Sequence, residues 1–344
     1  MAQHGLEGRP VFALGFNLHW RKSLNRFITG SEISHVRSAH KIPSGAIALV
    51  WGQRPVELPG SDIALVRLED GFLRSVGLGA EFAQPLSWVM DFNHLYFDAT
   101  GPSRLEQLLQ THSFSDAQRK RAGELICNIV GAGLSKYNTA SELWARPENE
   151  RVILVPGQVE TDASLAFGAP GIKTNIELLK TVRQQNPKAW VVYKPHPDVV
   201  SGARKQGEGE KKASQWCDEV ITSVSIASVL DQVDEVHTLT SLTGFEALIR
   251  NKPVTCFGLP FYAGWGLTAD MLACSRRTRT LSINELAHAA LVQYPMYASL
   301  IGKGFITPEQ ALSELHHGRS QNAAVKSGFG KMARKVINLV KGVQ

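Results

Sequence analysis

Short apolar runs alternate with amphipathic helical patterns along most of the chain. In the first half, four runs have the length and composition of buried strands, and two patterns of helical spacing follow them. Strands that alternate with helices are typical of parallel sheets built from βαβ units. The strands predicted here are 11–16, 46–52, 62–70 and 87–92, and the helices are 103–112 and 115–134, the second capped by Ser115.

A second series of the same kind follows a polar stretch at 135–150. It contains five predicted strands with three helices between them. The strands are 151–157, 189–195, 219–223, 234–240 and 253–258, and the helices lie near 174–186, 225–233 and 242–251. The same pattern on both sides of a polar stretch predicts two α/β domains.

The chain after residue 280 is predicted to form two amphipathic helices, 282–294 and 307–318, with no strand between them. We expect these terminal helices to return and brace the first domain. The predicted division is a first domain at 1–145, a second at 146–300, and C-terminal helices with a basic tail at 301–344.

Length and composition fit this division. A chain of 344 residues suits two domains of about 150 residues each. With 43% hydrophobic and 20% charged residues, the composition excludes a largely disordered protein. The net charge of +6 suits an anionic substrate or surface. Nucleic-acid binding is not expected, because the sequence lacks a clustered basic stripe within a recognisable module.

Cysteine usage and hydropathy bear on the compartment. The four cysteines are scattered, without CxxC pairs, which indicates free thiols in a reducing compartment. No signal peptide and no run of about 18 apolar residues is apparent, so we expect a protein that is cytoplasmic or peripheral on the inner membrane. The basic face of 326–341 predicts either an interfacial helix on an anionic membrane or a terminal helix packed on the domain.

Four groups of chemically capable residues follow predicted strands, where open α/β sheets place their ligands. The first is Lys194-Pro195-His196-Pro197. The two prolines fix the backbone so that the imidazole points into the crevice, where it and Lys194 can hold a phosphate. The alternative for His196 is a purely structural residue.

The second group is the segment 240–246, which joins a strand to a helix. Its hydroxyls and glycine, at a helix N-terminus, are suited to an anion. Ordinary helix capping is the alternative. The residues singled out are Thr240, Ser241, Thr243, Gly244 and Glu246.

The third and fourth groups carry carboxylates. Gln158, Glu160 and Asp162 follow strand 151–157, and one of the two acids can serve as a nucleophile or general base; the alternative is a helix-capping aspartate. In Glu69-Asp70-Gly71-Phe72-Leu73-Arg74, at the end of strand 62–70, the acids are candidates for proton transfer and the arginine for holding a substrate carboxylate. A surface ion pair is the alternative there.

Some motifs are absent from the sequence. It contains no GxxxxGK[ST], no GxGxxG and no acid cluster at metal-ligand spacing. We therefore expect no metal and no cofactor, with protein groups alone neutralising a bound phosphate.

Together these segments resemble the retaining β-Kdo glycosyltransferases of capsule biosynthesis. The matching stretches are LEDGFLRS (68–75), LVPGQVETDAS (154–164), YKPHPD (193–198) and TSLTGFEALIRNKPVTCFGLPFYAGWGLT (240–268). The resemblance implies an α/β, GT-B-like fold, with two Rossmann-like domains, a central cleft and C-terminal helices bracing the first domain. The first domain would take the acceptor, and the second would bind CMP-β-Kdo without metal.

The resemblance also implies roles for the singled-out residues. Asp162 would be the nucleophile, with Glu160 as its rival, and Glu69 the acid/base group. A β donor that yields a β product needs two inversions, hence a covalent intermediate. Substrate binding would involve Asp70, Arg74 (at the Kdo carboxylate) and Gln158; CMP binding would involve Lys194, His196, Thr240, Ser241, Thr243, Gly244 and Glu246.

Two other functions remain open from the sequence. A CDP-alditol or other nucleotide-sugar transferase would share the phosphate-binding segments but not the carboxylates. A non-catalytic glycan-binding module would bind acceptor without turnover. The expected partners are CMP-Kdo and a glycan or glycolipid acceptor of capsule, lipopolysaccharide or another polymer, with contact to an anionic inner membrane through the tail.

Overall fold

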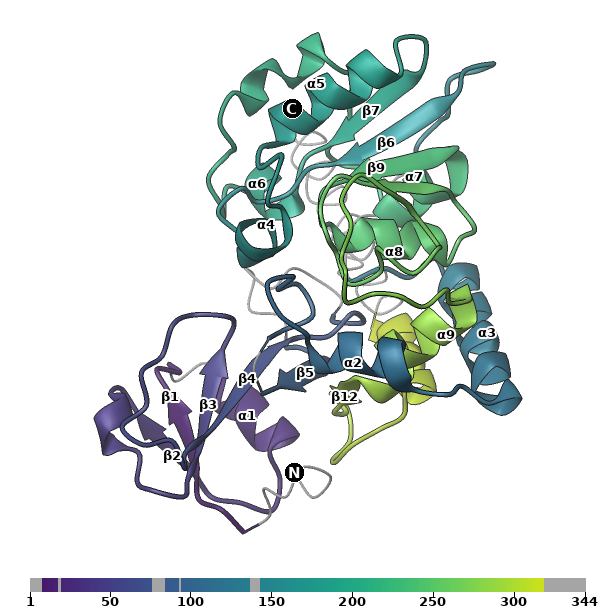
Figure 1. Ribbon diagram of the computed structural model, residues 1–344. Coiled ribbons are helices and arrows are strands. Elements are labelled where there is room, and N and C mark those ends of the chain that lie inside the picture. The colour runs from purple at the N-terminus through teal and green to yellow at the C-terminus, as the bar shows by residue number, and fades with distance from the viewer. Residues whose placement is uncertain (1–7, 18–19, 76–83, 93, 137–142, 319–344) are drawn as a thin grey trace, which may run out of the picture.

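The computed structural model describes residues 8–17, 20–75, 84–92, 94–136 and 143–318. These residues form two six-stranded sheets, each covered by helices, which lie one above the other in Figure 1. The α/β class with two Rossmann-like domains is thereby confirmed. The basic pattern at 326–341 lies outside the described residues.

The first sheet is mixed. Its order is β2-β1-β3-β4-β5-β12, parallel from β2 to β4 and antiparallel where β5 meets β4 and β12. The expectation of a parallel sheet is wrong at this edge because the chain turns directly back after β4: Gly71 N donates to Ser87 O (3.0 Å) and Leu86 N to Arg74 O (2.7 Å). A parallel neighbour would need a crossover to the other end of the sheet. The strands are β1 (Val11–Leu14), β2 (Ile33–Val36), β3 (Ile47–Trp51), β4 (Ala64–Asp70), β5 (Ser87–Asp91) and β12 (Pro295–Tyr297).

The second sheet is wholly parallel, with the order β8-β7-β6-β9-β10-β11. This is the Rossmann order, and it reverses between β6 and β9, where such sheets bind ligands beyond the carboxyl ends of the strands. The strands are β6 (Val152–Pro156), β7 (Trp190–Lys194), β8 (Glu219–Val220), β9 (Glu235–Thr238), β10 (Val254–Cys256) and β11 (Ala269–Asp270).

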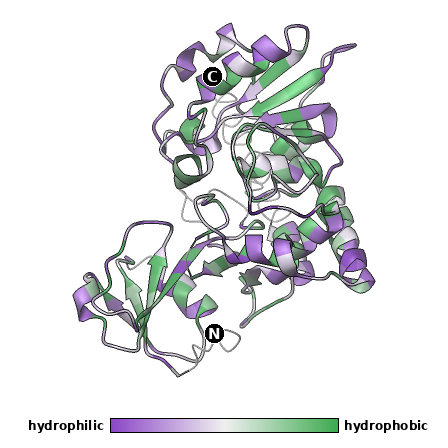
Figure 2. Ribbon diagram, in the orientation of Figure 1, coloured by the Kyte–Doolittle hydropathy of each residue, from purple (hydrophilic) through white to green (hydrophobic). Residues whose placement is uncertain are grey.

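The helices cover the faces of both sheets. Figure 2 shows mainly hydrophobic strands and mainly hydrophilic outer helical surfaces. Ser115 caps its helix as predicted, and a capping box with Gln118 completes the cap. The helices are α1 (Arg21–Phe27), α2 (Arg104–Thr111), α3 (Asp116–Gly131), α4 (Ala163–Gly168), α5 (Asn175–Gln185), α6 (Pro197–Val200), α7 (Ile226–Gln232), α8 (Leu242–Leu248) and α9 (Ile283–Ala287), with the 3-10 helices η3 (Ala39–Lys41) and η5 (Glu210–Gln215), the π-helix η6 (His288–Gln293) and a further helix at 308–318.

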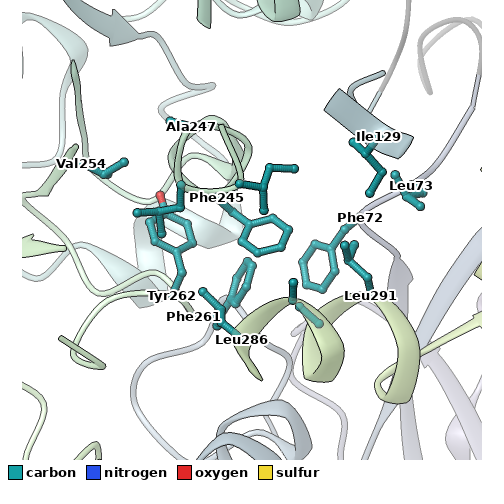
Figure 3. Close-up of a cluster of buried hydrophobic side chains, with 14 of the residues drawn as sticks. Phe72, Leu73, Ile129, Phe245, Ala247, Val254, Phe261, Tyr262, Leu286 and Leu291 are labelled. Atoms are coloured by element: carbon teal, nitrogen blue, oxygen red, sulfur yellow. The ribbon is translucent and has the colours of Figure 1, made fainter. Parts of the chain in front are cut away.

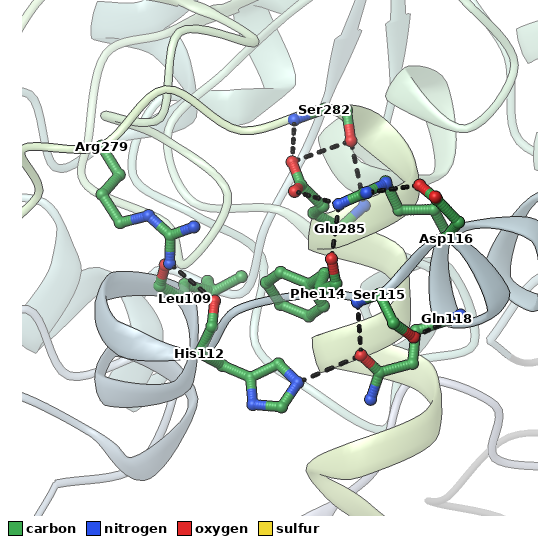
Figure 4. A network of polar contacts seen from close by, with 10 residues as sticks. Leu109, His112, Phe114, Ser115, Asp116, Gln118, Arg279, Ser282 and Glu285 are labelled. Atoms are coloured by element: carbon green, nitrogen blue, oxygen red, sulfur yellow. Dashed lines mark hydrogen bonds and ion pairs between the residues drawn. The ribbon is translucent and has the colours of Figure 1, made fainter.

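The end of the described chain returns to the first domain. α9 packs against α3, and Arg119 of α3 bonds Glu285, which in turn caps α9 through Ser282 (Figure 4). The bracing by terminal helices is confirmed. The absence of a strand between them is wrong: Pro295–Tyr297 pairs with β5. Three residues are too few to show the two-residue period of a strand.

Aromatic residues join the two domains. Phe72, just past β4, lies with its ring centroid 4.7 Å from that of Phe261 and 6.1 Å from that of Phe245. Figure 3 shows this side chain among residues of the second domain and Leu286 and Leu291 of the terminal segment. One hydrophobic core therefore runs through the junction and fixes the end of β4 against the second domain.

Within the described ranges, no helix is both long and apolar enough to cross a bilayer.

Candidate active site

The loops after β6 and β9 are tied together at the point where the strand order of the second sheet reverses. Gln158 Nε2 donates to Thr240 Oγ1 (2.9 Å), and Thr240 N donates to Gln158 Oε1 (3.0 Å). The backbone of Gln158 is held in turn by the Asn175 side chain, through two bonds of 2.9 Å. Gln158 is buried, so its amide positions the two loops against each other.

Asp162 lies at the end of the first of these loops and is the N-cap of α4. Its Oδ1 accepts a hydrogen bond from Ser164 N (2.9 Å). The capping interpretation is therefore correct. It is compatible with a reactive carboxylate, because the cap uses one of two oxygens and the side chain is only partly buried.

Glu160, two residues earlier, is bound on both oxygens. Oε1 accepts from Asn175 N, and Oε2 from Glu208 N, each at 2.9 Å. The carboxylate therefore joins the start of α5 to the 207–208 turn. Both oxygens of Glu160 hold backbone N–H groups, whereas the cap of Asp162 uses only one oxygen, so this geometry favours Asp162 over Glu160 as the carboxylate that can face a substrate.

His196 is held as a donor. It caps α6, with Nδ1 accepting from Asp198 N (3.2 Å). Burial lowers the pKa of its imidazole, so the ring is neutral at pH 7, and a neutral ring that accepts at Nδ1 carries its proton on Nε2. Burial also lowers the pKa of Lys194, at the end of β7, to about 8.

Glu69 is the second-last residue of β4, next to Asp70. Burial, and next the charge of Asp70, raise the pKa of Glu69 to about 8. Arg74 is buried: its Nε bonds Asp70 Oδ2 (2.5 Å) and its Nη1 bonds Ser75 Oγ (3.0 Å). The predicted ion pair exists, but it is buried rather than on the surface, and it orders the turn after β4.

Ser241 caps the start of α8, so the alternative of ordinary helix capping is correct for this segment. Ser241 Oγ accepts from Thr243 N (3.2 Å), and Ser241 O accepts from the Tyr262 hydroxyl (2.5 Å). Gly244 has a packing reason, since a Cβ there would lie 2.2 Å from the Tyr262 hydroxyl oxygen. The hydroxyls of Ser241 and Thr243 keep a proton to donate to a ligand.

Lys136, in the polar stretch between the domains, was missed by the sequence analysis. Its N donates to Glu246 Oε1 (2.9 Å), and its O accepts from Ser75 N (3.3 Å). The residue thus contacts one predicted segment of each domain, and Glu246 has a structural partner. A single lysine in a polar linker carries no sequence signal that distinguishes it.

Electrostatic interactions place four of these residues in one region. The charge of Asp162 raises the pKa of both Glu69 and His196, and the charge of Lys136 lowers the pKa of both. They come from four separate segments: the end of β4, the linker, the loop after β6 and the start of α6. This is the set that can hold an anion and move a proton.

The surroundings of this set hold neither a large cavity that joins it nor a metal cluster among the described residues. A cavity of about 360 Å³ adjoins Pro195, but it lies toward β8 and includes neither Asp162 nor Glu69. Across the part of the chain that the structure describes, no three His, Cys, Asp or Glu side chains are grouped to hold a metal ion.

Comparison with known proteins gives consistent relatives. The profile of the family described as "Capsule polysaccharide biosynthesis protein" matches residues 58–303. The capsule polysaccharide modification protein LipA of Neisseria meningitidis serogroup B is 46% identical over 310 residues, which is 88% of this chain and 44% of LipA. The lipopolysaccharide-processing protein LpsZ of Rhizobium meliloti is 39% identical over 312 residues, 85% of this chain and 71% of LpsZ. The chain thus spans less than half the length of LipA.

Two solved structures cover nearly the whole fold. The β-Kdo 2,7 transferase of Thermosulfurimonas dismutans KpsC superposes with a TM-score of 0.76 and 39% identity, over 90% of this chain and 99% of that one. The β-Kdo 2,4 transferase of the same KpsC gives a TM-score of 0.77 and 29% identity, over 91% and 99%.

Proposed function

This chain belongs to the capsule polysaccharide biosynthesis protein family, and on that premise we propose that it is a retaining β-Kdo transferase. The donor is CMP-β-Kdo and the acceptor is a glycan or glycolipid of a bacterial surface polysaccharide. The observation that carries the proposal is the grouping of Asp162, Glu69, His196 and Lys136 at the junction of the two domains.

In the first step, an Asp162 carboxylate oxygen attacks the anomeric carbon of Kdo. The bond from that carbon to the phosphate oxygen breaks, and CMP leaves with the electron pair. The helix cap supports this role, because it fixes Asp162 through Oδ1 and orients the other oxygen. The product is a sugar ester of Asp162 with inverted configuration.

In the second step, an acceptor hydroxyl attacks the same carbon and Asp162 leaves as a carboxylate. Glu69, in its ionised form, takes the hydroxyl proton. A second inversion restores the β configuration. A pKa near 8 suits a base that must also be protonated during the cycle.

The leaving phosphate gains negative charge in the first step, and protein groups stabilise it. His196 donates from Nε2, Lys194 supplies a charge, and the hydroxyls of Ser241 and Thr243 donate further. Lys136 is the cation we assign to the carboxylate of Kdo, in place of Arg74, whose guanidinium is bound by Asp70. The reaction then needs no metal.

The test is transfer from CMP-Kdo, generated in situ, to a panel of Kdo-terminated acceptors, with CDP-glycerol as the competing donor. The higher identity to the 2,7 transferase makes a β-2,7 linkage the product we propose. Mass spectrometry detects the added Kdo, and nuclear magnetic resonance gives its linkage and configuration. An α product, or turnover of CDP-glycerol alone, contradicts the proposal.

A further inference from the structure

The loop 299–305, between β12 and the helix at 308–318, exposes large apolar side chains. Leu300 is 42% exposed, Ile301 77% and Phe305 51%. Among the described residues, seven large hydrophobic side chains are exposed, and three of them fall within these seven positions (the yellow-green segment after β12 in Figure 1). Single exposed apolar residues are ordinary, but a contiguous group marks a contact surface.

The loop is held in one shape although its apolar side chains face outward. Ser299 Oγ accepts from Ile301 N (3.2 Å) and Gly302 N (2.7 Å), and Ser299 N donates to Gly304 O (3.1 Å). Glu314 then accepts from Ser299 Oγ (2.5 Å) and from Leu300 N (2.8 Å). The exposure is therefore built by specific hydrogen bonds and does not come from a loose connection.

Positive charge is concentrated in the sequence that follows this part of the chain. Residues 319–344 hold six of the 37 basic residues and none of the 31 acidic ones, so the rest of the chain has 31 of each sign and this stretch carries the whole net charge of +6. The helix runs to residue 318, four positions beyond Glu314, which is about 6 Å along a helix axis. The described chain therefore ends close to the loop, which itself contains Lys303.

We propose that the loop 299–305 inserts into the headgroup region of an anionic phospholipid bilayer, with residues 319–344 supplying the electrostatic attraction. An apolar insertion and a polybasic segment each bind membranes weakly, and stable attachment needs two such signals together. A protein partner would match the apolar side chains but would not account for a stretch with six positive charges and no negative one.

The position of the loop relative to β4 fits this surface. β12 pairs antiparallel with β5, and β5 antiparallel with β4, so β12 runs parallel to β4. Tyr297 lies opposite Ser87, whose O accepts from Gly71 N just after Glu69-Asp70. The loop therefore leaves the first sheet at the edge where β4 ends. A membrane bound there lies on the acceptor side of the proposed reaction.

The experiment uses the full chain and flotation with vesicles of phosphatidylglycerol and phosphatidylcholine, or of phosphatidylcholine alone, without any sugar donor. Its outcome is therefore independent of the proposed function. Wild type should float with the anionic vesicles only. Ile301→Asp, and the double variant Ile301→Asp/Phe305→Asp, should bind at least about tenfold more weakly, because a charge is moved into the interface.

Leu143→Asp is the matched control, since Leu143 is 86% exposed and lies outside the loop; it should bind like wild type. Replacing Lys331, Arg334, Lys335 and Lys341 by Gln should remove the preference for anionic lipid. Thermal melts confirm that each variant is folded. The proposal is overturned if Ile301→Asp binds like wild type, if wild type does not float, or if light scattering shows a wild-type dimer that Ile301→Asp dissociates while vesicle binding persists.

Discussion

The side chain of Gln158 exchanges two hydrogen bonds with Thr240, one with the backbone and one with the hydroxyl, and so links the loops that follow β6 and β9. We predict that Gln158→Met lowers turnover by about tenfold, because a thioether of similar length makes neither hydrogen bond to Thr240, and the loop that carries Asp162 shifts. Steady-state kinetics with a thermal melt measures both effects. Unchanged kcat in this variant would show that the link is dispensable.

Asp162 combines a cap with a proposed nucleophile, and substitution separates the two. Asn and Ser cap helices as well as Asp does, whereas Ala costs about 1 kcal/mol. Asp162→Asn and Asp162→Ser should therefore keep wild-type stability and CMP affinity and lose transfer by at least about a thousandfold. Intact-protein mass spectrometry on wild type with CMP-Kdo should show an adduct of one Kdo. Peptide mapping should then place it on residues 158–164.

Glu160→Gln is the matched control for Asp162. Its amide can still accept at one oxygen but loses one of two N–H partners, so the variant should be less stable by about 1 kcal/mol. It should still form the Kdo adduct on Asp162. An adduct that maps to Glu160 in wild type would refute the choice of nucleophile.

Glu69 should impose a pH dependence on both rate and stability. As a base, Glu69 is ionised above its pKa of about 8, whereas Lys194, which we assign to the phosphate, loses its charge above its own pKa of about 8. Transfer should therefore rise toward pH 8 and fall beyond it. Burial raises the pKa of Glu69 above the unfolded value near 4.5, so the folded state holds a proton that the unfolded state releases between these values. Unfolding free energy should therefore fall as pH rises from about 4.5 to 8.

Glu69→Gln should remove this pH-dependent loss of stability and abolish transfer while Kdo adduct formation on Asp162 continues. Urea unfolding at pH 5 and pH 8, together with pH–rate profiles, measures both effects. A flat wild-type rate profile between pH 6 and 9 would exclude Glu69 as the base.

Lys136→Met should raise KM for CMP-Kdo by about a hundredfold with less effect on affinity for CMP itself, because we assign its charge to the sugar carboxylate. Lys136→Arg should recover part of the loss. Isothermal titration with CMP and kinetics with CMP-Kdo distinguish the two ligands. An equal loss of affinity for both would place Lys136 at the phosphate.

Transfer should be unaffected by EDTA, since we assign the neutralisation of the phosphate to His196, Lys194 and backbone-held hydroxyls. The measurement is the initial rate with and without chelator, followed by addition of Mg²⁺ or Mn²⁺. A loss of about tenfold that either ion restores would contradict the metal-free proposal.

The second sheet could be predicted from the sequence except for the two-residue strand β11, because its other strands alternate with helices of clear period. The first was harder. β2 and β12 are short. The sequence of residues 71–86 also does not indicate that β5 will pair antiparallel with β4. Local sequence patterns cannot predict that β5 pairs with β12, which lies about 200 residues further along the chain.

The candidate site shows the same limit. Spacing placed Glu160 and Asp162 side by side, but only the N–H groups of Asn175 and Glu208, from other segments, distinguish a bound carboxylate from one with an oxygen to spare. Gln158 was assigned to substrate binding because the sequence does not show its structural partner, Thr240, which lies 82 residues further along the chain. The position of Lys136 depends on hydrogen bonds between its backbone and two distant residues, Ser75 and Glu246, which the sequence does not reveal.

The late return of β12 to the first sheet sets the order in which the protein matures during synthesis. The strands of the second sheet are complete once residue 270 has emerged from the ribosome, whereas the first sheet waits for residue 297. Until then, β5 presents an open edge that other chains can pair with. About 200 residues are synthesised between the end of β5 and the start of β12. The half synthesised first is thus the half finished last, and ribosomal stalling before residue 295 would release a chain prone to aggregate through β5.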